Sequence, residues 1–160
     1  MQVTETSVPT GTLIADYAAR DGHYTDCFEV ALDTPVDLAR YISAFYTQPL
    51  FRAERWVLRL LARSPSTDAD VAALADGTAQ SFAVWEVAGR TQTEILLQAK
   101  DGRTLSWLQA EADSLRFGSV VVPVQTPGGA LTLGPVFQSL VGAHKVYSRA
   151  LLAGAARRVA

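Results

Sequence analysis

Residues 129–158 read GALTLGPVFQSLVGAHKVYSRALLAGAARR, and this stretch decides the fold. Side chains spaced by three and four residues fall on one side of a helix, because successive residues turn by about 100°. The stripe that would face inward consists of Phe137, Leu140, Val141, His144, Ser148, Leu151 and Ala155. The pattern predicts one long amphipathic helix with a single histidine in the middle of its apolar side. Gly134-Pro135 either kinks this helix near its start or marks its true beginning.

The residues before this helix predict a sheet. Four strand candidates follow one another over residues 80–88, 91–99, 104–112 and 115–125. Their separators are Gly89-Arg90, Asp101-Gly102 and Asp113-Ser114, and Asp-Gly is the strongest short hairpin signal. A further strand is expected over residues 24–32. The resulting fold class is α+β, a curved antiparallel sheet wrapped around a long C-terminal helix, an arrangement that commonly encloses a ligand cavity.

Three helices are expected between the first strand and the others. The first would run over residues 35–46, with Thr34 as its cap and Asp37 completing the capping pattern. The second would run over residues 49–63, with an apolar side opposite a row of arginines: Arg52, Arg55, Arg59 and Arg63. Thr67 and Asp70 would cap the third, which ends at Gly77.

Composition limits the classes of function. The first 20 residues predict a loosely held polar arm, and residues 21–160 predict a single domain. The net charge of −2 with dispersed arginines disfavours nucleic-acid binding. Cys27 is the only cysteine, so an intrachain disulfide is excluded, and we expect it to be a small buried hydrophobic residue. The chain shows neither a signal-peptide pattern nor an apolar run of roughly 20 residues, so a cytoplasmic protein without a membrane span is expected.

Several short segments carry a family resemblance. They are residues 24–28 (YTDCF), 49–51 (PLF) with Trp56 and Leu60-Leu61, 82–86 (FAVWE), 94–97 (EILL) with 101–103 (DGR), and 144–152 (HKVYSRALL). The chain resembles an uncharacterised bacterial family of the START and polyketide-cyclase-like superfamily (SRPBCC), whose fold is the helix-grip. The resemblance implies binding of apolar small molecules or lipids between sheet and helix. This chain departs from the relatives at Thr104 and Ser106, where they carry a histidine and an aspartate.

His144 is the leading candidate for a polar role inside such a cavity, because a neutral imidazole can bond a ligand or move a proton. The other expected ligand-binding residues are Tyr147, Trp85, Trp107, Phe137 and Val141. Each of these six is also compatible with ordinary core packing. Glu54, Glu86 and Glu111 are candidate carboxylate partners for His144, although salt bridges at the edge of the core explain them as well.

These residues predict binding of a hydrophobic small molecule or lipid. One alternative is an enzyme of the cyclase, hydratase or isomerase kind that uses His144 with a carboxylate. Another is a structural or interaction module without a cavity. With two histidines, one cysteine and no phosphate-binding glycine motif, neither a metal nor a nucleotide cofactor is expected. A homodimer is compatible with the sequence.

Overall fold

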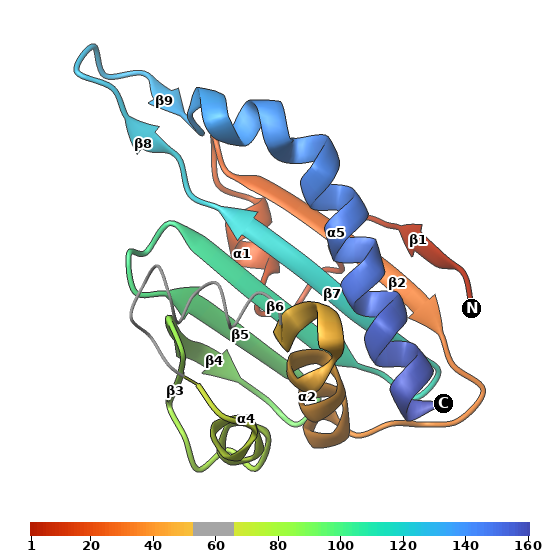
Figure 1. Ribbon diagram of the computed structural model, residues 1–160. Helices are drawn as coiled ribbons and strands as arrows, with labels where there is room; N and C mark the ends of the chain where they lie inside the picture. Colours follow the sequence, from red (N-terminus) through yellow and green to blue (C-terminus); the bar gives the residue numbers. More distant parts are fainter. Residues whose placement is uncertain (53–65) are drawn as a thin grey trace.

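The computed structural model describes residues 1–52 and 66–160, and places a long helix across one face of an antiparallel sheet (Figure 1). The seven strands of the sheet stand in the order β1-β2-β7-β6-β5-β4-β3. They are β1 (Val3–Glu5), β2 (Tyr24–Ala31), β3 (Ser81–Phe82), β4 (Trp85–Arg90), β5 (Glu94–Ala99), β6 (Thr104–Ala110) and β7 (Ser114–Val121). A separate ribbon pairs β8 (Val124–Gln125) with β9 (Leu131–Thr132). The helices are α1 (Ala15–Ala18), α2 (Leu38–Thr47), α4 (Asp68–Ala75) and α5 (Pro135–Val159). The predicted α+β class is confirmed.

The long C-terminal helix begins at Gly134-Pro135, which was the second of the two possibilities for this pair of residues. Gly134 is the N-cap of α5 with a φ of 88°, and Pro135 occupies the first turn, so this pair starts the helix and does not kink it. Only the second half of the predicted stripe is fully buried, including Ser148, Leu151 and Ala155. Leu140, in the first half, is 54% exposed. The helix therefore packs on β2, β7 and α2 through its C-terminal half and extends beyond the core at its start (Figure 1).

The capping side chains explain where the helices α2 and α4 begin. The Asp37 side chain accepts a hydrogen bond from the backbone N–H of Arg40, so α2 begins later than predicted, with Asp37 as its cap in place of Thr34. The predicted capping box of Thr67 and Asp70 is confirmed at α4. Residues 49–52 are helical, and the rest of the predicted second helix lies outside the described residues.

Two of the predicted strand boundaries are wrong for identifiable reasons. Gly89-Arg90 is not a turn, because β4 runs through it with a register shift between Val87 and Gly89. Arg90 instead donates hydrogen bonds to the carbonyls of Leu74 and Ala75 at the end of α4. The predicted strand 115–125 is interrupted, since β7 ends at Val121 and β8 begins at Val124 on the other side of Pro123. The Asp101-Gly102 hairpin is confirmed between β5 and β6.

The N-terminal residues form a layer on the other face of the sheet. β1 pairs with β2, and Ile14 is completely buried, so these residues differ from the expected loose arm. The carboxylate of Glu94 ties this layer to the sheet by accepting from the backbone N–H of Leu13 and from Nε1 of Trp107. A second apolar cluster results, made of Ile14, Cys27, Leu96, Leu105, Trp107 and Val120. The sheet is thus covered on both faces, by α2 and α5 on one and by this layer on the other.

Candidate functional site

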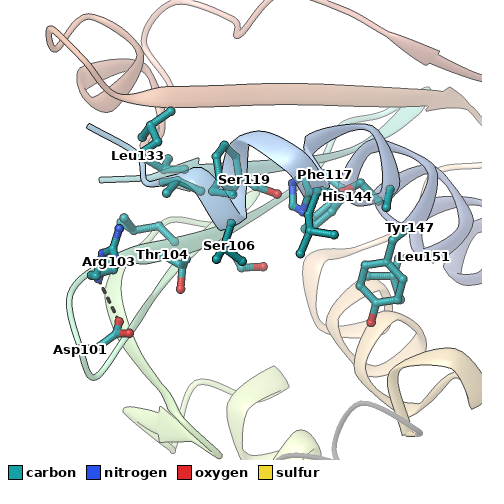
Figure 2. Close-up of a pocket in the computed structure, with 18 of the residues that line it drawn as sticks. Asp101, Arg103, Thr104, Ser106, Phe117, Ser119, Leu133, His144, Tyr147 and Leu151 are labelled. Carbon is teal, nitrogen blue, oxygen red and sulfur yellow. Dashed lines mark hydrogen bonds between the residues drawn. The ribbon is translucent and has the colours of Figure 1, made fainter. Parts of the chain in front are cut away.

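A pocket of about 900 Å³ lies between the α5 face of the sheet and the helix itself. Its aromatic lining among the described residues comes from Phe45, Phe51, Trp85, Phe117, Phe137 and Tyr147. Its polar lining comes from Asp101, Arg103, Thr104, Ser106, Ser119, His144 and Ser148. In Figure 2, Asp101 and Arg103 mark one end and Tyr147 and Leu151 the other, with Ser106, Ser119 and His144 between them. The pocket is therefore largely apolar, with polar side chains at one end and across its middle.

Four of the six predicted ligand-binding residues line this pocket: His144, Tyr147, Trp85 and Phe137. Trp107 does not, because strand alternation puts it on the opposite face from its neighbour Ser106. There it is completely buried and donates to Glu94 (2.7 Å). Val141 is half-buried on α5 but is not among the lining residues. The predictions for Trp107 and Val141 as pocket residues are therefore corrected.

His144 faces a buried carboxylate that the sequence analysis did not select. Its Nε2 lies 3.1 Å from Oδ2 of Asp26, whose side chain is 1% exposed. The two atoms are within ion-pair distance, although Nε2 is not aligned for a hydrogen bond. The predicted carboxylates lie elsewhere: Glu86 is exposed, Glu111 is half-buried just after β6, and Glu54 lies outside the described residues. Asp26 could have been recognised, because it is two residues before Phe28 and so shares the apolar face of its strand.

Two further groups hold the Asp26 carboxylate. The Tyr24 hydroxyl donates to Oδ2 and the backbone N–H of Ser119 donates to Oδ1, both at 2.9 Å. Burial, and after it the adjacent charge and hydrogen bond of Asp26, raise the pKa of Tyr24 well above its usual value. Tyr24 therefore stays a neutral donor at physiological pH. These bonds hold the Asp26 carboxylate beside His144, which lines the pocket, whereas Asp26 is not among the lining residues.

A row of polar residues crosses the pocket floor. Asp26 pairs in register with Ser119, and Ser119 with Ser106, so the three stand side by side on β2, β7 and β6. The next pairs of residues on the same face are Thr104 with Val121 on one side and Leu108 with Phe117 on the other. Thr104 and Ser106 both line the pocket.

Besides Nε2 of His144, two buried polar atoms of the pocket wall have no hydrogen-bond partner among the described residues. Ser148 is completely buried on α5, and its hydroxyl is unpaired. The indole Nε1 of Trp85 on β4 is likewise buried and unpaired. Buried polar groups of proteins are paired in the great majority of cases. Both residues line the pocket, so a bound molecule would be their natural partner.

The remaining sequence candidates do not form a second site. Burial raises the pKa of the Cys27 thiol to about 12, and the residue packs in the cluster on the far face, which confirms it as a small buried hydrophobic residue. Arg52 forms an ion pair with Asp68, and the other three arginines of the predicted row lie outside the described residues. Over residues 1–52 and 66–160, no group of His, Cys, Asp and Glu is placed to hold a metal ion. Within the same ranges, no helix has the length and apolar character to cross a bilayer.

Comparison with known proteins identifies no relative: no family model, curated protein or solved structure matches the chain.

Proposed function

We propose that this protein binds a hydrophobic small molecule or lipid in the pocket between the sheet and α5, within a domain of the helix-grip type. The pocket itself is the observation that carries the proposal, because about 900 Å³ falls in the range of small-molecule sites, about 300–1,000 Å³. Its lining is mainly apolar, so affinity would come from burial at about 25 cal/mol per Å² before the costs of ordering. The pocket also favours binding over the alternative of a module without a cavity.

A bulky side chain at Ala143 tests the proposal. Ala143 lines the pocket yet is exposed on α5, so a tryptophan there would enter the pocket without disturbing the core. Ala150 is a matched control, because it is an exposed alanine of the same helix outside the lining. The measurement is titration with the neutral dye Nile red, together with native mass spectrometry of the freshly purified protein.

We expect saturable dye binding by the wild type and by Ala150→Trp. Ala143→Trp should weaken it about tenfold or more, which corresponds to about 1.4 kcal/mol. A co-purified adduct, if it is seen by native mass spectrometry, should be lost from Ala143→Trp alone. Binding that is absent from the wild type, or equal in the two variants, would reject the pocket as a ligand site.

The contact between His144 and Asp26 favours a second candidate function, proton transfer on a bound ketone of the kind an isomerase performs. Nε2 of His144 lies 3.1 Å from Oδ2 of Asp26, and we assign the other ring nitrogen, Nδ1, to the ligand. The ring would take a proton from the carbon beside the carbonyl and return it to the same or a conjugated carbon. Deuterium uptake from D₂O by methyl nonyl ketone should then exceed that in buffer and be lost in His144→Gln. Uptake equal to buffer would reject catalysis and leave ligand binding in place.

A further inference from the structure

The unpaired hydroxyl of Ser148 limits the chemistry of the ligand. A serine inside a helix ordinarily bonds a carbonyl of the preceding turn. Ser139 does so near the start of α5, where its hydroxyl donates to the carbonyl of Val136. Ser148 does not, although it is 0% exposed and lines the pocket. A buried hydroxyl without a partner destabilises a protein by about 1–3 kcal/mol, so a ligand atom that pairs with it would be bound preferentially.

The indole N–H of Trp85, the second unpaired group, indicates that the ligand atom is a hydrogen-bond acceptor. This indole N–H can only donate, and it too is buried in the pocket wall with no partner in residues 1–52 and 66–160. A hydroxyl can donate as well as accept, so an oxygen acceptor satisfies either group. The ligand should therefore carry a carbonyl, ether or hydroxyl oxygen.

The charge of this oxygen is set by Asp26. Its carboxylate is buried beside His144 at the end of the polar row, next to Ser119. A ligand carboxylate placed at the row would meet this negative charge in surroundings of low dielectric constant, where like charges repel strongly. The cation of the lining among the described residues, Arg103, lies at the end of the pocket and not at the row. Glu5 is paired with both Lys145 and Arg149, so it adds no net negative charge, and Asp26 is the charge that decides. The oxygen facing the row is therefore neutral.

The position of the polar row gives the place of the oxygen along the ligand. Ser106 and Ser119 lie between Thr104 and Val121 on one side and Leu108 and Phe117 on the other. Beyond the row, Leu133 lies at the same end as Asp101 and Arg103, and Tyr147 and Leu151 lie toward the other end. Figure 2 shows the same order, with Ser106 and Ser119 between the Leu133 end and the Leu151 end. Ser148 lies on α5 about one turn after His144 and one turn before Leu151, so an oxygen bonded to it would lie part-way along the pocket.

We infer that the ligand is an apolar molecule with a neutral oxygen acceptor part-way along its length, bonded by the Ser148 hydroxyl. This inference rests on the proposed function, because it needs the same pocket to be a binding site. It deepens that function by naming the ligand class: an apolar chain or ring system with a neutral oxygen, in contrast to a hydrocarbon or to an acid whose carboxylate faces the row.

Two isomeric ketones provide the test, since they have the same composition and nearly the same apolar area. Dipentyl ketone carries its carbonyl at the centre of the chain, and methyl nonyl ketone carries it near one end. Each is titrated against bound Nile red in the wild type, in Ser148→Ala and in the matched control Ser139→Ala. Ser139 is suitable because it is an exposed serine of the same helix that does not line the pocket.

We expect the wild type and Ser139→Ala to prefer dipentyl ketone by about fivefold, the size of one neutral hydrogen bond. Ser148→Ala should lose this preference while it binds methyl nonyl ketone as the wild type does. Its melting temperature should stay equal or rise, because it loses an unpaired buried hydroxyl. Equal binding of the two ketones by the wild type, or a preference retained in Ser148→Ala, would overturn the inference alone. Failure of both ketones and the dye to bind would overturn the proposed function with it.

Discussion

Gly118 on β7 lies where three parts of the molecule meet. A Cβ at this position would stand 2.8 Å from the backbone oxygen of Asp26, 2.9 Å from Cδ1 of Ile14 and 3.0 Å from Cε3 of Trp107. The first of these atoms belongs to the neighbouring strand and cannot move aside cheaply. The absence of a side chain therefore allows the N-terminal layer to pack against the sheet directly behind the strand that carries Asp26.

Gly118→Ala should consequently lower the free energy of unfolding by about 1–3 kcal/mol, the usual effect of overpacking. Gly142→Ala is the matched control, since no atom lies within 4 Å of its added Cβ. In a helix interior this change should leave stability equal or raise it by up to about 1 kcal/mol. Urea denaturation of the two variants measures the difference, and equal stabilities would show that the close approach at Gly118 is unimportant.

At the same scale, some site residues were predictable and others were not. His144 stands in an apolar stripe that is visible in the sequence, whereas its partner Asp26 comes from a strand more than a hundred residues earlier. Trp107 could not be assigned to a face, because β6 is buried on both sides and Leu105, Ser106, Trp107 and Leu108 show no contrast of polarity between the faces.

Among the elements, α5 divides into a half that stabilises the fold and a half that borders the pocket. Leu152 is completely buried in the main core, whereas Leu140 is 54% exposed and lines the pocket. Leu152→Ala should lower the free energy of unfolding by about 2–5 kcal/mol. Leu140→Ala should change it by less than about 0.5 kcal/mol and weaken Nile red binding instead. Thermal melts and dye titrations of both variants check this, and a large loss of stability in Leu140→Ala would contradict the division.

The long elements were predictable and the short ones were not. The apolar period of three and four identified α5, and the Asp-Gly pair identified the β5–β6 hairpin. The β8–β9 ribbon was missed because two-residue strands have no period that a sequence pattern could show. Gly89-Arg90 was wrongly predicted as a turn because the contact that explains Arg90 is distant in sequence. Its side chain donates hydrogen bonds to carbonyls at the end of α4.

For the whole molecule, burial on both faces of the sheet has a consequence for stability at alkaline pH. Burial raises the pKa of Cys27 from 9.0 to about 12, and raises the pKa values of Tyr24 and Tyr41 well above 10.0. The folded protein keeps these protons at a pH where the unfolded chain releases them, so the unfolded chain is stabilised relative to the folded one.

We therefore expect the free energy of unfolding to fall as the pH rises above about 9, and to fall more steeply above about 10. Urea midpoints measured between about pH 7 and pH 10.5 check this expectation. Cys27→Ala provides the control, because without the thiol the decline should begin only where the tyrosines ionise. A curve that is flat across this range, or that rises, would contradict the assignment.

The sheet ends in very short strands on both sides, with three residues in β1 and two in β3. Strands this short offer few backbone N–H and C=O groups of their own, and short edge strands are one means by which natural sheets avoid aggregation by strand addition. A second copy of the chain that paired with β1 or β3 would find little backbone to extend, so a side-chain surface is the better place for self-association. The protruding start of α5, where Val136 and Leu140 are exposed, would be such a surface, and a copy seated there would lie against the pocket wall.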